Sequence, residues 1–414
     1  MELLRFFTAG NVDDGKSTLI GRLLYDSESI STDIIETLTR QSKTTGVNAD
    51  IDLALLTDGL RAEREQGITI DVAYKYFTTE KRKFIIADTP GHIQYTRNMF
   101  TGASNADLAI ILVDARNGIT DQTKRHSIIA SILGIPHVLV CVNKMDLVNY
   151  SETVYNEIQT AYNEFATPLN LKQVSFIPTS ALAGDNVVHT SENLSWYDGP
   201  SLLGFLETVD ETDNQQKEEP RFQVQYVIRP QTDELHDYRG YAGSILSGHF
   251  RVGDRVQVLP SGLETTVSAI ELNREQVQEA FRGEAIVLHL AEDLDVSRGN
   301  TIVPIDELPR TEKSLEATIC WMDNVPFQPG QKLLLQQNSF RTKAVLKELS
   351  GKIDIHSYEQ LESDGSLKLN DFAHVTIKTA EAVSIDPYVI NRKTGAFILI
   401  NENTNNTVAA GIFN

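Results

Sequence analysis

Near its amino terminus the chain reads Gly10-Asn11-Val12-Asp13-Asp14-Gly15-Lys16-Ser17, followed by Thr18. This spacing matches the pattern G-x-x-x-x-G-K-[ST], in which a strand turns tightly into a helix and wraps a phosphate group. The flanking residues agree with that arrangement: residues 3–7 read as a short buried strand, and apolar residues recur at helical spacing in residues 19–24. The segment therefore predicts a nucleotide-binding loop at the start of an α/β domain.

The whole loop from Gly10 to Thr18 is predicted to bind phosphate. Its glycines let the backbone curl so that successive N–H groups point at the β-phosphate, and the helix starting near Lys16 adds its positive end. Lys16 is expected to reach the β- and γ-phosphates, and the Ser17 hydroxyl to bind Mg²⁺. Taken alone, the motif also fits a glycine turn that only caps a helix. Two further motifs downstream decide between these interpretations.

The composition narrows the class of protein. The 414 residues suffice for two or three domains, and no apolar run approaches the length of about 20 residues that spans a membrane. Cys141 and Cys320 lie far apart in apolar stretches, and the first expected strand starts almost at Met1. We therefore expect a cytoplasmic protein with reduced thiols and no secretory signal. The net charge of −20 argues against a broad nucleic-acid-binding surface, so neither a nucleic acid nor a membrane is expected as a partner.

The first half of the chain alternates between expected strands and helices. The expected strands are 3–7, 72–78, 83–87, 107–114, 137–142 and 174–178, and the helices that follow the first one are 94–101, 121–133, 151–165 and 200–209. Continuous apolar runs such as 107–114 are typical of strands buried on both faces of a mostly parallel sheet. Beyond residue 220, short β-like runs alternate with Gly and Pro turns. We predict an α/β P-loop domain with a doubly wound, mostly parallel sheet at 1–212, then two all-β barrels at 220–307 and 312–414.

A second motif, Asp88-Thr89-Pro90-Gly91-His92, follows the expected strand 83–87 and completes the predicted phosphate site. Asp88 at the strand end is placed to hold Mg²⁺, through a bound water. Gly91 permits its N–H to approach the γ-phosphate closely. His92 is the catalytic candidate, because it could orient the attacking water as a glutamine does in other GTPases. A loop histidine without a role is the alternative.

A third motif, Asn143-Lys144-Met145-Asp146, ends the next core strand and predicts a guanine site. Asp146 can accept hydrogen bonds from guanine N1–H and the 2-amino group, which adenine does not offer on that edge. Sites of this kind can reject the wrong ligand by about 10⁴-fold or more. Lys144 would lay its stem along the base, and Asn143 would tie the base to the phosphate loop. Backbone N–H groups for guanine O6 are expected from Ser180-Ala181-Leu182.

The long polar segment from residue 27 to 70 is too long for a simple connection, which suggests a function. Thr69 near its end is the natural second hydroxyl ligand for Mg²⁺, and it would be held only while the γ-phosphate is present. We expect the segment to be an order–disorder switch, with Thr69 serving both metal binding and catalysis. The alternative is that Thr69 simply enters the strand that follows.

The three motifs followed by two barrels resemble the translation-factor class of GTPases, and residues 60–71 look much like elongation factor 1A. A closer resemblance is to the GTP-binding large subunit of bacterial sulfate adenylyltransferase. Residues 12–24, with Asp14 where translation factors usually carry His, resemble that family. So do 81–92, 95–99, 195–197, 221–226, 238–243, 394–398 and 407–411. The chain departs from the family at Ile93, where a glutamate is usual, and in the longer segment 231–237.

The resemblance implies a GTPase subunit that works with a separate small catalytic subunit, as a heterodimer or larger assembly. GTP hydrolysis here would drive the joining of sulfate to AMP from ATP on that partner, in sulfate assimilation and cysteine biosynthesis. The implied ligands of this chain are GTP and Mg²⁺. The alternative is a translation factor that resembles elongation factor 1A and delivers RNA to the ribosome. The Asp14 signature and the net charge of −20 favour the first interpretation.

Overall fold

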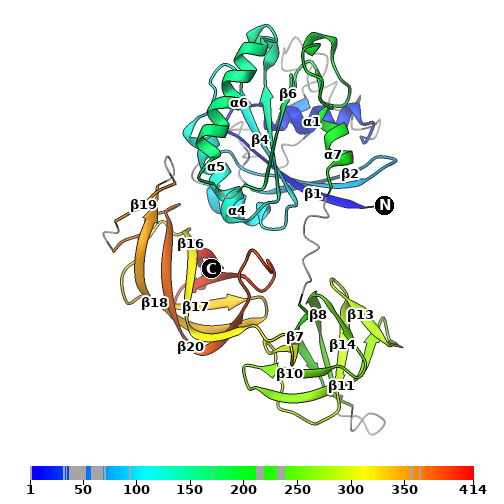
Figure 1. Ribbon diagram of the computed structural model, residues 1–414, viewed down its shortest axis with the longest axis vertical. Coiled ribbons are helices and arrows are strands. Elements are labelled where there is room, and N and C mark those ends of the chain that lie inside the picture. The colour runs from blue at the N-terminus through cyan, green and yellow to red at the C-terminus, as the bar shows by residue number, and fades with distance from the viewer. Residues whose placement is uncertain are drawn as a thin grey trace. The chain divides into compact units, whose positions relative to one another are not determined.

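The computed structural model describes residues 2–30, 33, 35, 36, 53–56, 69, 71–92, 95–169, 171–210, 219–230, 238–354, 358–362 and 365–414. Their contacts divide the chain into two compact units (Figure 1). The first comprises Met1–Asp213 with Asp354–Glu359, and the second Asn214–Ile353 with Gln360–Asn414. No helix in the described part of the chain is long and apolar enough to cross a bilayer.

The first unit is built on a six-stranded sheet with the order β2-β3-β1-β4-β5-β6. Its strands are β1 (Leu3–Ala9), β2 (Ala73–Thr78), β3 (Lys83–Asp88), β4 (Leu108–Asp114), β5 (His137–Asn143) and β6 (Gln173–Pro178). Only the edge strand β2 runs antiparallel, against β3; the other pairings are parallel. Every residue of β4 and β5 is buried, which explains their uninterrupted apolar sequences. The predicted, mostly parallel sheet is confirmed.

Helices cover both faces of this sheet, with α4, α5 and α6 on one side and α1 and α7 on the other (Figure 1). Their bounds are α1 (Lys16–Asp26), α4 (Thr96–Ala103), α5 (Asp121–Ile132), α6 (Glu152–Ala166) and α7 (Leu202–Thr208), with short 3₁₀ turns at η1 (Leu53–Leu56), η3 (Met145–Val148) and η4 (Glu192–Leu194). The last two helices start later than the sequence suggested, because Ser151 and Ser201 are N-caps whose hydroxyls accept from Val154 N–H and Gly204 N–H. Apolar side chains of α1 and α7 share one core with the sheet.

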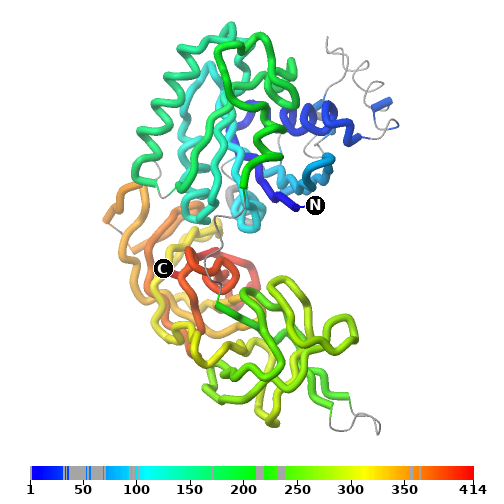
Figure 2. The backbone as a smooth tube through the Cα atoms, turned by 45° about the vertical axis from the view of Figure 1, so that its right-hand side comes forward, coloured from blue at the N-terminus to red at the C-terminus, as the bar shows by residue number. Residues whose placement is uncertain are grey.

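The second unit contains two closed barrels. In the first, the ring β10-β15-β7-β8-β14-β11 is closed by the β10–β11 pairing; in the second, the ring β17-β21-β22-β16-β20-β18 is closed by β17–β18. Figure 2 shows the backbone of this part of the chain curving round on itself. Each barrel has its own cluster of buried apolar residues. The bounds are β7 (Arg221–Ile228), β8 (Gly240–Ser247), β9 (His249–Arg251), β10 (Arg255–Leu259), β11 (Leu263–Leu272), β12 (Glu275–Val277), β13 (Glu279–Phe281), β14 (Ala285–Leu290), β15 (Thr301–Pro304), β16 (Arg310–Trp321), β17 (Lys332–Gln337), β18 (Phe340–Ile353), β19 (Gln360–Leu361), β20 (Phe372–Ile385), β21 (Ala396–Asn401) and β22 (Thr407–Phe413). The prediction of two all-β barrels is confirmed.

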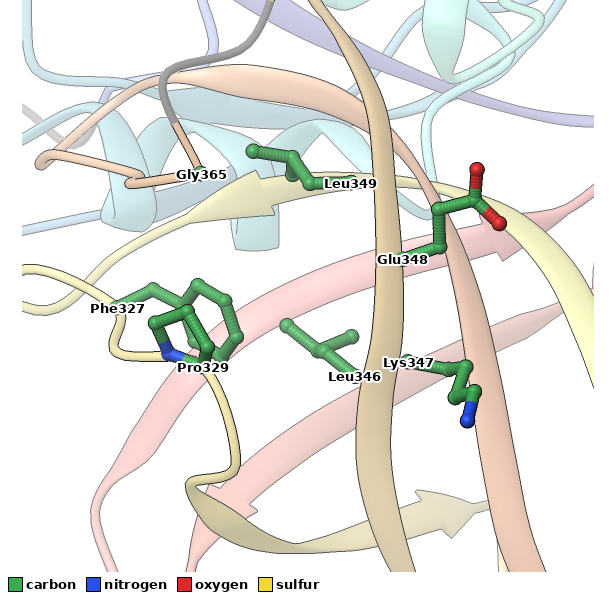
Figure 3. A pocket seen from close by; sticks show the side chains of 7 residues that line it. All are labelled: Phe327, Pro329, Leu346, Lys347, Glu348, Leu349 and Gly365. Atoms are coloured by element: carbon green, nitrogen blue, oxygen red, sulfur yellow. The ribbon is translucent and has the colours of Figure 1, made fainter.

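A shallow hollow of about 310 Å³ lies on the second barrel (Figure 3). Leu346 and Leu349 of β18 point toward it, opposite Phe327 and Pro329, whereas the charged ends of the neighbouring Lys347 and Glu348 point away. None of the residues lining it belongs to the predicted nucleotide motifs. It therefore does not contribute to the site described next.

Candidate nucleotide-binding site

The predicted motifs meet at one edge of the sheet. In the parallel register Thr8 of β1 lies beside Asp88 of β3, and Asp114 of β4 lies beside Asn143 of β5. The carboxyl ends of β1, β3, β4, β5 and β6 therefore gather the phosphate loop and the motifs that end in His92, Asp146 and Leu182. Ligands of open α/β sheets bind at this edge.

The phosphate loop has the backbone geometry that its glycines and helix start demand. Gly15 has a φ of +93°, and a Cβ there would lie 2.6 Å from the Asn143 side-chain nitrogen, so both conformation and space require glycine. Helix α1 follows at Lys16, with no side chain capping it. Within the described loop, the N–H groups of Gly15, Lys16, Ser17 and Thr18 have no recorded partner. They form a ready anion-binding end of the helix.

The earlier loop residues bond mainly within the loop. Asn11 N–H donates to Asp14 Oδ2 at 2.6 Å, Val12 N–H to the Asn11 side chain at 2.9 Å, and Asp14 N–H to Asn11 O at 3.3 Å. Burial raises the pKa of Asp14, against the lowering effect of the Asn11 N–H and of Lys16. Asn11, Val12 and Asp14 thus shape the loop, and their contacts with phosphate stay a prediction.

Lys16 lies at the centre of the loop. Its side chain is buried, and Nζ donates to the carbonyls of Gly10 at 2.8 Å and Asn11 at 2.9 Å. A Cβ on Gly91 would lie 2.4 Å from this nitrogen, so the second motif packs directly against the lysine. Burial lowers the pKa of Lys16, whereas the charges of Asp88, Asp14 and Asp13 raise it.

Two side chains have the chemistry of a Mg²⁺ site. Asp88 is a buried carboxylate at the end of β3 that accepts a hydrogen bond from Thr8 Oγ1 at 3.3 Å. The Ser17 hydroxyl in the first turn of α1 has no recorded partner among the described residues. Mg²⁺ prefers such oxygen ligands and keeps several waters, so this pair fits the ion. Thr69 is partly buried, but most of the segment 27–70 lies outside the described residues.

The loop after β3 is held by a residue that the sequence did not single out. Gln122 in the first turn of α5 donates its amide to Gly91 O at 2.8 Å and contacts His126 Nε2 at 3.2 Å. His92 follows as a partly buried residue whose ring centroid lies 6.0 Å from that of Tyr95. Thr89 is fully buried and donates its hydroxyl to Thr8 O at 2.6 Å, so its side chain is used within the fold. Ile93 lies outside the described residues.

The third motif is joined to the phosphate loop by two side chains. Asn143 Nδ2 donates to Asp14 O at 2.8 Å, and Lys144 donates to Asp13 O. Lys144 Nζ also lies 2.9 Å from Asp114 Oδ2, an oxygen of a buried carboxylate to which the Arg116 guanidinium donates at both oxygens. One sequence signal points to Asp114: it ends a buried strand, as Asp88 and Asn143 do.

The expected base-reading residues lie together, with one exception. Ser180 Oγ donates to Asp146 Oδ1 at 2.6 Å, and Ala181 N–H donates to Asn143 Oδ1 at 2.9 Å. Met145 is fully buried and its N–H donates to Thr179 O at 3.1 Å. The expectation that Met145 contacts the base is therefore corrected: its apolar side chain packs in the core.

Known proteins match both the domains and the whole chain. Residues 1–220 match the family described as "Elongation factor Tu GTP binding domain", and residues 314–414 match "GTP-eEF1A C-terminal domain-like". The S. cerevisiae Ski7 GTPase-like domain, solved with GDP and inorganic phosphate, has a TM-score of 0.55 at 18% identity and covers 100% of this chain and 97% of its own. That likeness supports the fold.

Two groups of relatives are much more similar in sequence. "Sulfate adenylyltransferase subunit 1" of Colwellia psychrerythraea is 49% identical, covering 100% of this chain and 88% of the relative. The protein of the same description from Bacteroides fragilis is 49% identical over 99% of this chain and 86% of its own length. "Bifunctional enzyme CysN/CysC" of Mycobacterium tuberculosis is 49% identical over 99% of this chain and 67% of its own. The chain therefore belongs to the sulfate adenylyltransferase subunit 1 family, whose nucleotide-binding domain is of the elongation factor Tu type.

Proposed function

We propose that the chain is the GTPase subunit of a two-subunit sulfate adenylyltransferase. It hydrolyses GTP to drive the formation of adenylyl sulfate and pyrophosphate from ATP and sulfate on a small partner subunit. The observation that carries the proposal is the meeting of three nucleotide motifs at one sheet edge, in a chain that is 49% identical over its full length to a sulfate adenylyltransferase subunit 1. We propose that the GTP-binding domain spans residues 1–212 and that the two barrel domains span 220–307 and 312–414.

The phosphates would bind over the start of α1. The N–H groups from Gly15 to Thr18, which donate to no other described residue, would donate to phosphate oxygens. The Lys16 ammonium would exchange the carbonyls of Gly10 and Asn11 for phosphate oxygens. Ser17, Asp88 through a water, and Thr69 would hold Mg²⁺, which neutralises charge on the β- and γ-phosphates. Gly91 N–H would approach the γ-phosphate, since no side chain fits between it and Lys16.

His92 would orient the attacking water. The support is its place directly after Gly91, whose carbonyl is anchored by Gln122 at 2.8 Å, so that the peptide leading into His92 is fixed. Positioned general bases contribute roughly 10²- to 10⁴-fold to a rate. The role is therefore large enough to be measured.

Guanine would lie between Lys144 and the loop from Ser180 to Leu182, with Asp146 accepting from N1–H and the 2-amino group. Asp146 already accepts from Ser180 Oγ at 2.6 Å, which orients its carboxylate. Asn143 bonds to Asp14 O on one side and to Ala181 N–H on the other, so it links the phosphate and base sites. A carboxylate that must face two donors rejects adenine, because it would otherwise be left unpaired.

The experiment is to measure phosphate release and adenylyl sulfate formation together, with the small subunit, ATP and sulfate present or absent. A GTPase of this class is slow when unaided, on the order of 10⁻⁴ s⁻¹ in one case, because charge on the γ-phosphate is incompletely stabilised. We expect slow hydrolysis by the chain alone, and severalfold acceleration when the partner and its substrates are added. Adenylyl sulfate should then accumulate only with GTP.

Thr69→Ala is the variant that tests the route of coupling. It should abolish the acceleration and leave GDP binding intact, since Thr69 is proposed to act only while the γ-phosphate is present. A fast GTPase indifferent to partner and sulfate would contradict the proposal. Capture of an aminoacyl-tRNA instead of a small catalytic subunit would point to a translation factor.

A further inference from the structure

The turn that follows β6 leaves one backbone donor available for a base. All but one of the N–H groups from Ser180 to Gly184 have a recorded partner: Ser180 donates to Asp185 O at 3.1 Å, Ala181 to Asn143 Oδ1 at 2.9 Å, Ala183 to Ser180 Oγ at 3.3 Å, and Gly184 to Ser180 O at 2.7 Å. Within this fully described turn, the remaining N–H is that of Leu182. It is therefore the donor best placed to meet a carbonyl of the base.

The opposite side of the same turn is held by a guanidinium from α1. Arg22 Nε donates to Ala181 O at 3.3 Å, and Arg22 Nη2 donates to Leu182 O at 2.6 Å. The third nitrogen, Nη1, lies 3.4 Å from Asp26 one helical turn on. A guanidinium presents its donors in a rigid fork, so both carbonyls are held in a fixed relation to α1.

Gly184 of the turn lies close to the side chains of Arg22 and Asp26. Gly184 has a φ of +89°, and a Cβ there would lie 3.3 Å from Asp26 Oδ2 and 3.5 Å from Arg22 Cδ. The turn and α1 are thus in close contact on this side. Because α1 begins at Lys16, the same helix presents its N-terminus to the phosphates and its arginine to the base loop.

The geometry of the peptide bond connects these observations. Ala181 C=O and Leu182 N–H belong to one planar trans peptide and point in opposite directions. When Arg22 holds the carbonyl toward α1, it directs the available N–H away from α1. The orientation of that donor is therefore set from outside the base site.

We propose that Arg22 is a positioning residue for guanine recognition, which fixes the Leu182 N–H so that it reads the O6 carbonyl of the base. This inference rests on the proposed guanine site. It assigns the two polar ends of the base to separate parts of the protein. Arg22 acts on O6 through the turn, whereas Asp146 contacts N1–H and the 2-amino group with its own side chain.

The test compares three diphosphates on the full chain by competition against a fluorescent GDP. GDP carries both groups, inosine diphosphate lacks only the 2-amino group, and 2-aminopurine riboside diphosphate lacks O6 and N1–H but keeps the 2-amino group. In Arg22→Ala, we expect the penalty for the 2-aminopurine nucleotide relative to GDP to fall by roughly two- to tenfold, the range of one hydrogen bond. The penalty for inosine diphosphate should change by less than about twofold.

Matched variants separate positioning from general loosening. Asp26→Asn removes the charge of the partner of Nη1 but keeps both carbonyl contacts, so both penalties should equal those of the unaltered chain. Arg22→Lys keeps the charge and the stem but lacks the rigid planar fork that holds both carbonyls in one geometry, and it should reproduce the Arg22→Ala effect if that variant fails to fold. Equal loss of both penalties, or an unchanged 2-aminopurine penalty in a folded Arg22 variant, would overturn the inference. An unaltered chain that does not distinguish the three nucleotides would instead refute the guanine site itself.

Discussion

The ammonium of Lys144 lies 2.9 Å from the carboxylate of Asp114, and the same ammonium donates to the carbonyl of Asp13 in the phosphate loop. Burial of Asp114 opposes its ionisation, but hydrogen bonds from Arg116 and Lys144 outweigh that effect and hold the pKa of the carboxyl well below its usual range. The carboxylate therefore stays charged at neutral pH. It anchors the lysine that we propose to lie along the base.

Replacing Asp114 should weaken nucleotide binding through Lys144. In Asp114→Asn the side chain that holds the Lys144 ammonium loses its charge. The variant therefore loses a charge-assisted hydrogen bond, which contributes about 1.5–3 kcal/mol. We expect GDP and GTP to bind roughly ten- to a hundredfold more weakly by equilibrium titration. Arg116→Gln is the matched control: its side chain is half exposed and it leaves the Lys144 contact in place, so affinity should change little. Equal effects of the two variants would contradict the anchoring role.

His92→Ala should bind GTP normally and hydrolyse it far more slowly. A group that contacts only the attacking water stabilises the transition state and not the ground state, so kcat should fall by roughly 10²- to 10⁴-fold at an unchanged Kd. Gln122→Leu removes the donor to Gly91 O and should lower kcat by up to about tenfold, again at constant Kd. Single-turnover hydrolysis with a separate binding titration measures both. An unchanged turnover in His92→Ala would make it a loop histidine without a catalytic role.

Lys16→Ala and Ser17→Ala should each remove most GTPase activity while the fold is retained, since neither side chain belongs to the apolar core of the unit. The two losses should respond differently to metal. Ser17→Ala acts through lost Mg²⁺ affinity, so raising Mg²⁺ should restore part of its activity and none of that of Lys16→Ala. Turnover measured across a Mg²⁺ series tests this separation. Equal rescue of both variants would contradict it.

His126 should make the first unit less stable in acid. Burial, with the charges of Lys16 and Arg125, lowers the pKa of this imidazole to about 3, whereas an unfolded histidine titrates near 6.5. Between these values the unfolded chain holds a proton that the folded chain lacks. The free energy of unfolding therefore decreases as the pH is lowered, by about 1.4 kcal/mol per pH unit. His126→Gln should remove this part of the pH dependence.

The measurement is urea unfolding at pH 5 and pH 7, followed by Trp196 fluorescence. Trp196 lies in the first unit, and Trp321→Phe removes the second tryptophan of the chain. From pH 7 to pH 5, the free energy of unfolding should decrease by about 2 kcal/mol more in the unaltered chain than in the His126→Gln variant. Parallel pH profiles would show that the imidazole is not buried in its neutral form.

The order of the elements could be predicted because buried strands such as β4 and β5 are continuous apolar runs, and because the motifs lie at the ends of β1, β3, β5 and β6. Residues that act across space could not be found in this way. Gln122 reaches Gly91 and Asp114 reaches Lys144 only because the sheet brings separate strand ends together. Met145 shows the converse: it lies inside a motif, yet its side chain packs in the core. Position in a motif indicates proximity to a site, and only the packing shows which side chains face it.

The central claim is that GTP hydrolysis at this site drives sulfate activation on a partner, and one variant tests both parts of it. In Asp146→Asn a carboxylate oxygen becomes a donor, which opposes the donors of guanine and complements the 2-carbonyl of xanthine. We therefore measure adenylyl sulfate formed by the complex of this variant with the small subunit, ATP and sulfate. The account predicts that xanthosine triphosphate supports product formation and GTP no longer does, with the reverse in the unaltered chain. Product formation by the variant that still depends on GTP, or that is independent of either nucleotide, would contradict it.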